Sequence, residues 1–381
     1  MENKIIQGDC LESLKKLESG SIQCCITSPP YWGLRDYGVD GQLGLEKTPE
    51  EYVAKMVAIF AEVKRILRDD GTLWLNLGDS YAGSGKGIGS EPDPKWDKAR
   101  NDESKHKTDW SNIGLKPKDL VGVPWRVAFA LQADGWYLRS DIIWNKPNPM
   151  PESVKDRPTK SHEYIFLLSK KQTYYYDQEA VRESQSEGTI DRYKNNNKIP
   201  SYNKTGGSAR KSDSFTASTP MAILTNGRNL RSVWTFATQP VKEAHFATYP
   251  EELVRRCMMA GTSEKGQCAK CGSPWERIVE RKAENHISRA DRQEATGGAI
   301  SGGVGKNFPD IEIQTLGWQP TCDCNADVEP QTILDPFFGS GTTGIVACRG
   351  NRRYIGIELN PEYVKIAEKR LKPYESNHNL L

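Results

Sequence analysis

The sequence lacks any long hydrophobic run. Its longest apolar stretches suit short strands and amphipathic helices, and no hydrophobic signal segment follows the first residues. A membrane-spanning or secreted protein is therefore not expected, and we predict a soluble protein of the cytoplasm. The chain also lacks a net excess of charge, because 52 Lys and Arg residues oppose 50 Asp and Glu residues. Binding of nucleic acid would then require a local basic patch.

Disulfide bonds are not expected either. Nine cysteines, an odd number, are scattered through 381 residues without a secretion signal. Four of them form two close pairs in a polar, non-helical region: Cys268 with Cys271, and Cys322 with Cys324. Four thiolates can close a tetrahedral zinc site and fix an insertion too small for its own core. We favour a structural zinc over free or redox-active thiols, and four sulfur ligands leave no open position for catalysis. His286 is an alternative ligand, although a lone histidine in a charged stretch is more often exposed.

Strands and helices alternate along most of the chain, which predicts an α/β protein with a mostly parallel sheet covered on both faces. Thr48 to Glu51 form a capping box with proline at the first helical position, and apolar residues then recur on one helix face until Gly71. A polar stretch from Ser80 to Asn112 is expected to be a mobile loop. The expected strands are Lys4–Gln7, Ile22–Thr27, Thr72–Leu77, Tyr137–Trp144, Glu163–Leu168, Thr332–Leu334 and Arg353–Ile357. The other expected helices are Leu11–Leu17, Pro124–Ala133, Pro250–Met259, one that ends at Cys348, and one that Asn360 caps and that stops at Pro373.

The segment from Arg182 to Arg231 has a different composition. It carries nine basic and four acidic residues, and Tyr193, Tyr202 and Phe215 lie among them. Basic side chains for phosphates and aromatic groups for bases are typical of a nucleic-acid reader. A solvated, partly disordered insertion explains the same composition, and both interpretations stay open.

A glycine-rich turn lies near the end of the chain. Gly339, Gly341 and Gly344 have the spacing of a dinucleotide-binding turn between a strand and a helix, and Glu358 ends the next strand. The glycines allow a close approach of the backbone to a ligand, the helix N-terminus favours an anionic group, and Glu358 can accept hydrogen bonds from ribose hydroxyls. S-adenosylmethionine has a ribose and a carboxylate and fits as well as NAD. It is favoured because fewer than 40 residues follow the turn, too few for a second nucleotide-binding half, and because Asp-Pro-Phe precedes the glycines. No phosphate-loop motif occurs.

A second motif, Ser28-Pro29-Pro30-Tyr31-Trp32, follows the early strand Ile22–Thr27. Methylation of an exocyclic amine requires hydrogen-bond acceptors that draw the nitrogen lone pair out of conjugation. A serine hydroxyl and a proline carbonyl, held rigid by two prolines, can supply them. Tyr31 offers a face on which a base swung out of the duplex can stack. The main requirements are then that the methyl donor and the target amine lie close together and in line, and the reaction needs no metal or covalent intermediate. The alternative for this motif alone is an ordinary strand that ends in a proline turn.

Together the two motifs, in this order, resemble the β class of S-adenosylmethionine-dependent amino-group DNA methyltransferases. The resemblance covers most of residues 1–262 and 331–381 and implies a circularly permuted Rossmann-like fold with a target-recognition insertion, here beside a small zinc-ribbon-like insertion. In that family Ser-Pro-Pro-Tyr goes most often with cytosine N4, and Asp or Asn in place of Ser goes with adenine N6. We therefore expect N4 methylation of cytosine, with adenine N6 as the nearest alternative. Carbon-5 methylation needs a nucleophilic cysteine just after the proline, whereas Cys24 and Cys25 lie upstream in the apolar strand.

The resemblance also implies the site residues. Trp144 to Pro149 resembles a segment that lines the target-base pocket. His245 to Pro250 corresponds to a segment that closes over the methionine end of the cofactor, although its sequence departs from the usual one. For Asp9, capping of the following helix is an equal alternative to cofactor binding. The expected catalytic residues are Ser28, Pro29, Pro30 and Tyr31. The expected cofactor-binding residues are Asp9, Phe246, Thr248, Asp335, Pro336, Phe337, Gly339, Gly341, Thr342 and Glu358.

The expected division of the chain follows from these motifs. Residues 1–181 form the catalytic half, 182–240 the target-recognition insertion, 241–262 the cofactor-closing segment, 263–327 the zinc-binding insertion, and 328–381 the cofactor-binding half. The expected partner is double-stranded DNA, and a homodimer and a cognate restriction nuclease are compatible with the resemblance. Methylation of RNA or of a protein glutamine, and a non-catalytic zinc-ribbon protein that binds nucleic acid, are more remote alternatives.

Overall fold

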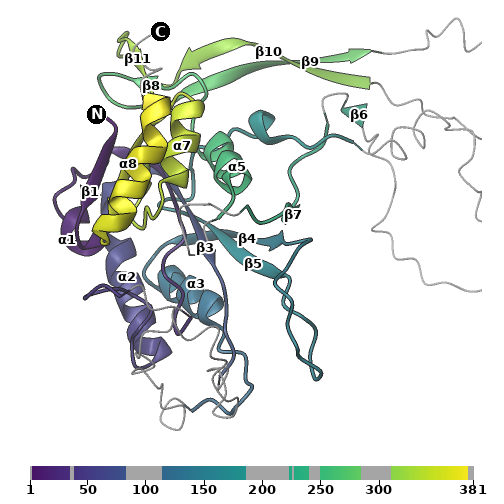
Figure 1. The fold of residues 1–381 in the computed structure, drawn as a ribbon. Helices are drawn as coiled ribbons and strands as arrows, with labels where there is room; N and C mark the ends of the chain where they lie inside the picture. Colours follow the sequence, from purple (N-terminus) through teal and green to yellow (C-terminus); the bar gives the residue numbers. More distant parts are fainter. Residues whose placement is uncertain are drawn as a thin grey trace, which may run out of the picture. The chain divides into compact units, whose positions relative to one another are not determined.

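The computed structural model describes residues 2–34, 38–82, 114–185, 223–224, 227–239, 249–284 and 310–375 (Figure 1). They belong to two units. The first comprises Met1–Asp177, Arg231–Trp275 and Pro320–Leu381, and the second comprises Gln178–Leu230 and Glu276–Gln319. No helix among the described residues is long and apolar enough to cross a membrane.

An eight-stranded sheet is the centre of the first unit. Its strands, in spatial order, are β1 (Lys4–Gln7), β13 (Arg353–Glu358), β12 (Thr332–Asp335), β2 (Ile22–Thr27), β3 (Leu67–Leu77), β5 (His162–Ser169), β4 (Tyr137–Asn145) and β7 (Val233–Thr235). All neighbours are parallel except β5, which is antiparallel to both β3 and β4. The predicted mixed α/β fold with a mostly parallel sheet is confirmed.

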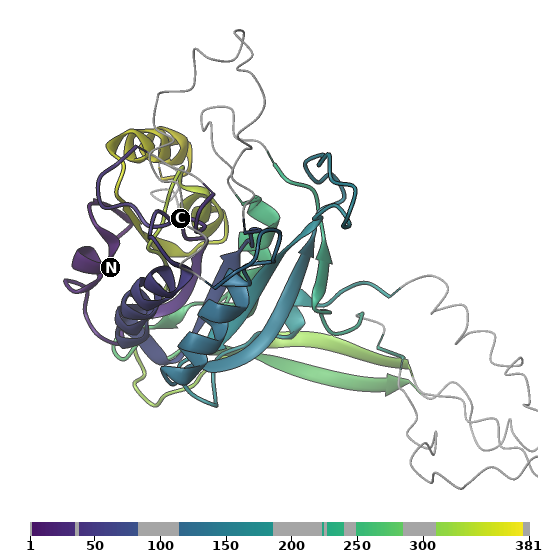
Figure 2. The same ribbon diagram turned by 90° about the horizontal axis from the view of Figure 1, so that it is seen from below.

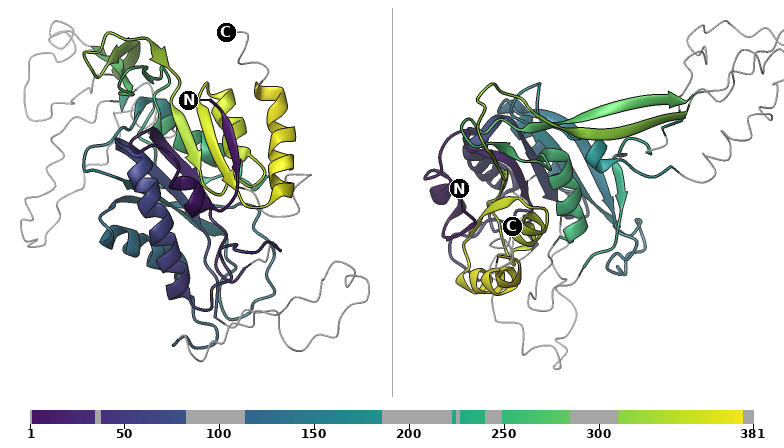
Figure 3. Two further views of the ribbon diagram at one scale, coloured as in Figure 1. Left: turned by 90° about the vertical axis from the view of Figure 1, so that its left-hand side faces the viewer. Right: turned by 90° about the horizontal axis from the view of Figure 1, so that it is seen from above.

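The strand order interleaves the two ends of the chain. The late strands β12 and β13 lie between the early strands β1 and β2, with Gln7 opposite Glu358 and Cys25 opposite Leu334. Figure 3 shows the purple N-terminal strand beside the yellow-green strands of the C-terminal segment. The strands that carry the two sequence motifs are therefore direct neighbours in one sheet, as the permuted motif order requires.

Helices cover both faces of the sheet (Figures 2 and 3). Successive strand residues point to opposite faces. Cys25 belongs to the buried cluster with Met56 and Phe60 of α2, whereas Cys24 lies against Gly261, where an added Cβ would come within 2.9 Å of its sulfur. One layer consists of α1 (Cys10–Leu14), α2 (Pro49–Ile66) and α3 (Val123–Ala133). The other consists of α5 (Glu251–Gly261), α7 (Thr342–Arg349) and α8 (Pro361–Glu375).

The helix expected to reach Gly71 ends earlier. Helix α2 stops at Ile66, and β3 begins at Leu67 and continues through Gly71. Leu67 pairs with Ile22 of β2, and its carbonyl accepts a hydrogen bond from Lys170 Nζ at 2.8 Å. Backbone pairing of β3 with β2 therefore outweighs, from Leu67 on, the helical spacing of apolar residues in the sequence. Gly71 is an interior strand residue, where a Cβ would lie 3.0 Å from two backbone oxygens.

Other expectations also differ from the structure. Helix α1 ends at Leu14 rather than Leu17, and α8 continues past Pro373 to Glu375. A proline has helical φ, and in the last turn it removes a single backbone hydrogen bond, so the helix tolerates it there. Strand β7 was not expected, because it has only three residues, and the longer strands Trp275–Glu284 and Asp310–Pro320 were not expected either. The loop expected over Ser80–Asn112 lies, from residue 83 on, outside the described residues.

The second unit contains a three-stranded sheet in the order β6 (Ile223–Leu224), β10 (Asp310–Pro320) and β9 (Trp275–Glu284), beside a short 3₁₀ helix at Glu179–Val181. Strands β6 and β10 are parallel, with Ile223 opposite Asp310. Parts of the two expected insertions therefore share one sheet. The paired cysteines belong instead to the first unit, with the antiparallel pair β8 (Gln267–Cys268) and β11 (Val328–Glu329).

A buried carboxylate joins the early and late halves of the large sheet. Asp335, which ends β12, is fully buried, and its Oδ1 accepts a hydrogen bond from Thr27 Oγ1 at the end of β2 at 2.6 Å. Its Oδ2 accepts from Thr343 Oγ1 of α7 and from Tyr249 Oη, each at 2.6 Å, and the Phe337 amide donates to Oδ1 at 3.1 Å. Burial raises the pKa of this carboxyl, and the four donors oppose that rise.

Removal of one donor from this carboxylate should destabilise the fold. Thr27→Val keeps the side-chain shape and leaves Asp335 with one fewer hydrogen bond, so we expect a loss of about 1–3 kcal/mol in the free energy of unfolding measured in urea. Thr235→Val, on an exposed position of β7, is the matched control and should change stability by less than about 0.5 kcal/mol. Equal effects of the two substitutions would contradict the role given to Asp335.

Candidate active site

The site lies where strands of the large sheet end. Because β1, β13, β12 and β2 are parallel, their carboxyl ends meet at one edge. Asp9, Phe337 and Ser28 follow β1, β12 and β2 there, and Glu358 is the last residue of β13. All four residues line one pocket. The crevice at the carboxyl ends of the strands is where open α/β sheets bind ligands.

Most of the expected site residues lie in this pocket. Those that line it are Asp9, Ser28, Pro30, Pro336, Phe337, Gly339, Thr342 and Glu358. Those that do not are Pro29, Tyr31, Asp335 and Gly341. Phe246 and Thr248 lie outside the described residues. The pocket thus joins the two motifs, which are about 300 residues apart in the chain.

The glycines of the late turn have different roles. Gly339 has φ of +52° and lines the pocket. Gly341, with φ of +82°, is the N-cap of α7, and a Cβ there would lie 3.0 Å from Ala367 Cβ of α8. Gly341 therefore allows α8 to pack closely against the turn. Asp335 likewise supports the pocket from beneath, through the hydrogen bonds described above.

Glu358 is held by the backbone of the turn beside it. Its Oε2 accepts a hydrogen bond from the Gly339 amide at 2.7 Å, and its Oε1 accepts one from the Asn360 amide at 2.8 Å. Burial raises the pKa of this carboxyl, while these two amides favour the charged form. Each oxygen keeps a second lone pair, so the carboxylate can still accept two hydroxyl hydrogens.

Asp9 has the helix-capping contact that its sequence context allows. Its Oδ1 accepts a hydrogen bond from the Glu12 amide at 2.9 Å, at the N-terminus of α1. The helix-cap interpretation of Asp9 is therefore confirmed. The residue also lines the pocket beside Glu358, so the cap orients the carboxylate there.

S-adenosylmethionine fits the chemistry of this pocket. The lone pairs of Glu358 suit the two hydroxyls of a ribose, and the apolar side chains of Leu43, Phe337 and Ile357 suit an adenine ring. Helix α7 begins at Gly341 without a side-chain cap, and its amides suit a carboxylate. The described residues that line the pocket include no lysine or arginine, in keeping with a ligand that has no phosphate.

The Ser-Pro-Pro-Tyr-Trp turn is rigid. The Pro30 carbonyl accepts a hydrogen bond from Tyr52 Oη at 2.9 Å, and the buried Trp32 donates from Nε1 to the Glu46 carbonyl at 2.9 Å. The ring of Tyr31 packs on Gly78, where an added Cβ would lie 2.5 Å from the ring. Ser28 Oγ donates to Tyr31 Oη at 3.3 Å.

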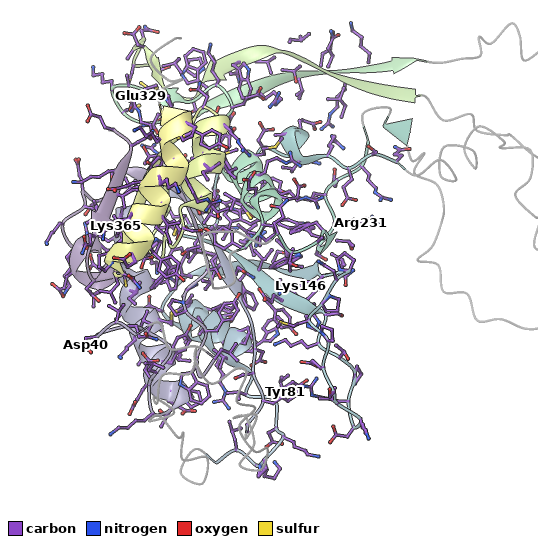
Figure 4. All side chains as sticks on the ribbon, viewed as in Figure 1. Asp40, Tyr81, Lys146, Arg231, Glu329 and Lys365 are labelled. Carbon is purple, nitrogen blue, oxygen red and sulfur yellow. The ribbon has the colours of Figure 1, made fainter. Side chains whose placement is uncertain are left out.

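A polar cluster that sequence analysis missed surrounds the hydroxyl of Tyr31. Glu163, near the start of the antiparallel strand β5, accepts a hydrogen bond from Tyr31 Oη at 2.7 Å and one from Asn76 Nδ2 at 3.2 Å on the same oxygen. Its other oxygen pairs with the ammonium of Lys146, which follows β4 (Figure 4). The sequence feature that could have identified Glu163 is an acidic residue near the start of a strand whose later residues are mostly apolar.

The segment expected to line the target-base pocket begins with a buried tryptophan. Trp144 stacks on Phe236 with ring centroids 5.5 Å apart and donates from Nε1 to the Phe236 carbonyl at 2.9 Å. Lys146 Nζ lies 4.3 Å from the centre of the Trp144 ring. Trp144 thus supports Lys146 and, through it, Glu163.

Other pocket residues were also missed. Val39, Gly41, Gln42 and Leu43 come from an irregular loop that carries no motif. Others stand close to expected residues: Tyr249 lies within the expected closing segment His245–Pro250, and Asn360 and Tyr363 follow Glu358. Their proximity in sequence was the available signal.

The two cysteines near the Ser-Pro-Pro-Tyr motif are not nucleophiles. Cys24 and Cys25 are fully buried in β2. Burial raises the pKa of the Cys24 thiol to about 12 and that of Cys25 well above its usual value. A thiol must ionise to attack, so the interpretation of both as small buried residues holds.

The four paired cysteines converge. The sulfur atoms of Cys268, Cys271, Cys322 and Cys324 all lie within 4.8 Å of one another. This arrangement of four sulfurs fits the tetrahedral coordination that zinc prefers in structural sites. The Cys271 carbonyl accepts a hydrogen bond from Arg68 Nη1 at 2.9 Å, which ties the cluster to the large sheet.

Known proteins resemble this chain over nearly its whole length. A family model described as DNA methylase matches residues 22–269 and 328–369. The type II methyltransferase M.Cfr9I of Citrobacter freundii is 41% identical over 373 residues, which cover 98% of this chain and 89% of the relative. The type II methyltransferase M.SmaI of Serratia marcescens is 39% identical over 368 residues, which cover 97% and 90%.

A solved structure agrees with the fold. The PvuII DNA methyltransferase, described as cytosine-N4-specific, superposes with a TM-score of 0.52 and 16% sequence identity. The match covers 98% of this chain and 91% of that chain. At this identity the likeness concerns the fold alone.

Substitution of Glu358 should weaken the binding of S-adenosylmethionine. Glu358→Gln loses a charged acceptor and turns an NH₂ group toward one of two backbone amides, so we expect the dissociation constant from calorimetry to rise by about 10–100-fold. Glu362→Gln, an exposed change in the first turn of α8, is the matched control. Unchanged binding by E358Q would contradict the proposed contact.

The binding should also depend on pH. The ionised form of Glu358 is the acceptor, and its pKa is raised, so affinity should fall as acid protonates it, at a higher pH than for an ordinary glutamate near 4.3. The affinity of the E358Q protein should not decrease over this pH range. An equal decrease in affinity in both proteins would show that another group titrates.

Proposed function

The chain belongs to the DNA methylase family, and from that premise we propose that it transfers a methyl group from S-adenosylmethionine to the N4 amine of a cytosine within a specific sequence of duplex DNA. The observation that carries the choice of an amine is the position of Ser28. This residue lines the pocket and directs its own hydroxyl hydrogen away, to Tyr31 Oη. Its oxygen lone pairs are therefore available as acceptors.

Ser28 and the Pro29 carbonyl hold the target amine. An exocyclic amine is a poor nucleophile while its lone pair is delocalised into the ring. Two acceptors that take its hydrogens orient the nitrogen so that the lone pair points to the methyl group. Pro29 and Pro30 keep both acceptors in place, since each ring fixes a φ angle, and Tyr52 anchors the turn from below.

Tyr31 supports the flipped base. Gly78 under the ring and three polar partners around the hydroxyl fix its orientation, so little side-chain entropy is lost when a base stacks on it. A fixed aromatic face also compensates for part of the cost of unstacking the base from the duplex.

The pocket, which Ser28 and Pro30 also line, would hold the cofactor. When bound, it supplies a methyl group on a positively charged sulfur. Glu358 accepts from its ribose, and Asp9, Phe337, Gly339 and Thr342 form the wall around it. Phe246 and Thr248 are proposed to close over its other end. Correct orientation of donor and acceptor then supplies most of the rate enhancement.

Cytosine is favoured over adenine because position 28 is Ser rather than Asp or Asn. Residues 182–240 are proposed to read the target sequence, on the strength of their basic and aromatic composition. The relatives M.Cfr9I and M.SmaI are named type II methyltransferases, which supports a cognate restriction nuclease as a partner in the cell.

A structural zinc completes the proposal. The four converging sulfurs join two segments about 50 residues apart, at the points where the chain leaves the first unit after Trp275 and returns at Pro320. Zinc bound there would hold together the two ends of the segment between Trp275 and Pro320, in a region with few buried apolar side chains. The four sulfur ligands exclude a catalytic role for this ion.

Elemental analysis of the purified protein tests the zinc site. We expect about one zinc ion per chain, because four thiolates bind zinc far more tightly than ordinary side-chain clusters do. Cys322→Ser and Cys324→Ser should each lose most of the metal, whereas Cys348→Ala, which changes a buried cysteine of α7, should retain it. Metal-free wild-type protein, purified from zinc-supplemented medium, would contradict the site.

Methylation of mixed-sequence DNA tests the proposed function. Duplex DNA incubated with the protein and S-adenosylmethionine should yield N4-methyldeoxycytidine when its nucleosides are analysed by mass spectrometry. N6-methyldeoxyadenosine instead would overturn the choice of base and leave the enzyme class intact. No methylated nucleoside from any duplex would contradict the function.

A matched pair of variants isolates the role of Ser28. Ser28→Ala removes an acceptor and should lower the methylation rate by about 100-fold or more while leaving the affinity for S-adenosylmethionine within about threefold. Ser21→Ala, at a half-buried position before β2, should leave both unchanged. An equal loss of rate and of affinity in S28A would reject the role of Ser28 as an acceptor.

A further inference from the structure

Methyl transfer creates a proton that must leave the site. The amine nitrogen forms a new bond to carbon while the carbon–sulfur bond breaks with its electrons on sulfur. The nitrogen then carries a methyl group, two hydrogens and a positive charge until one hydrogen departs. No histidine or carboxylate is part of the Ser-Pro-Pro-Tyr turn to take it directly.

A chain of hydrogen bonds leads from Ser28 to a carboxylate. Ser28 Oγ donates to Tyr31 Oη at 3.3 Å, and Tyr31 Oη donates to Glu163 Oε2 at 2.7 Å. Tyr31 Oη also lies 3.1 Å from Asn76 Oδ1. The shorter distance and the charge of the carboxylate make Glu163 the stronger acceptor.

The geometry points to Glu163 as the acceptor of the proton that the target amine releases, an inference that rests on the proposed methylation of an amine. The amine gives its proton to Ser28 Oγ, Ser28 passes its hydroxyl hydrogen to Tyr31, and Tyr31 passes its phenolic hydrogen to Glu163 Oε2. The nitrogen becomes neutral, Ser28 and Tyr31 are restored, and the carboxylate becomes a carboxylic acid.

The surroundings of Glu163 allow this role. Lys146 pairs with Oε1 and leaves Oε2 to Tyr31. Asn76 Nδ2, which also donates to the Tyr164 carbonyl at 3.0 Å, holds Oε2 in position. The Glu163 side chain keeps 15% of its surface exposed, so it can return the proton to water after the transfer.

The orientation of each donor supports a directional relay. Lys146 cannot accept a proton while it is an ammonium, and the Asn76 amide donates toward Glu163. The basic oxygen of the cluster is therefore on the carboxylate, at the far end of the chain from the pocket. Tyr31 connects the pocket wall at Ser28 to that oxygen.

Single-turnover methylation of the DNA sequence that the wild-type enzyme modifies tests the relay. Glu163→Gln keeps the shape and should slow the methyl-transfer step by about 100-fold, as should Tyr31→Phe, which keeps the ring and removes the hydroxyl. The rate of methyl transfer in the double variant should lie within about threefold of the rate in either single variant, because both substitutions interrupt one pathway. Independent contributions would instead multiply to about 10,000-fold.

Two further measurements separate proton transfer from a loss of structure. Affinity for S-adenosylmethionine by calorimetry, and fluorescence of 2-aminopurine at the target position as a measure of base flipping, should stay within about threefold of wild type in E163Q. Sodium formate should restore part of the rate of Glu163→Ala, since it can replace the missing carboxylate. The exposed Glu50→Gln change in the first turn of α2 is the matched control.

The outcomes distinguish the relay from the proposed function. A rate of E163Q within about twofold of wild type, or loss of 2-aminopurine fluorescence that accounts for the slower rate, would overturn the relay while methylation by the wild type stands. Methylation of adenine by the wild type would leave the relay intact, because an N6 amine must also release a proton. Absence of methylation in the wild type would overturn both.

Discussion

The carboxylate of Asp335 accepts hydrogen bonds from residues that belong to three distant parts of the chain. Thr27 comes from the early strand β2, Tyr249 from the segment before α5, and Thr343 from the late helix α7. Thr27 immediately precedes Ser28, and Asp335 lies four residues before Gly339, the first glycine of the late turn. Together with the pairing of β12 and β2, one buried group therefore links the two walls of the pocket.

The direction of the strands explains why the site has its composition. Parallel strands bring Asp9, Ser28, Phe337 and Glu358 to one edge, and the antiparallel strand β5 brings its first residues, including Glu163, to the same edge. A parallel β5 would carry Glu163 to the opposite edge. The single reversal in the sheet is what lets a carboxylate reach the hydroxyl of Tyr31.

Much of this arrangement was predictable from local patterns. Strands β1 and β2, the capped helix α2 and the glycine turn each have strong signals within a few residues, and Glu358 follows from its spacing to the turn. The end of α2 at Ile66 was not predictable, because the pairing of Leu67 with Ile22 depends on a distant strand. Glu163 and the loop at Val39–Leu43 were missed for the same reason: their neighbours in space are remote in sequence. The convergence of the four cysteines was also predictable, because they occur as two close pairs in the sequence. A metal site is one of the few structures that bring four thiols together in a polar region.

The interleaved strand order has a consequence for synthesis on the ribosome. Strand β1 is synthesised long before its partner in the sheet, β13, which is complete only at residue 358. Until β12 and β13 have been synthesised, β2 lacks its neighbour β12 and β1 lacks its neighbour β13, whereas β3 already has both of its neighbours, β2 and β5. The pocket therefore forms only after β13 has been synthesised, and a product truncated before this strand would carry the Ser-Pro-Pro-Tyr turn without the wall that contains Ile357 and Glu358.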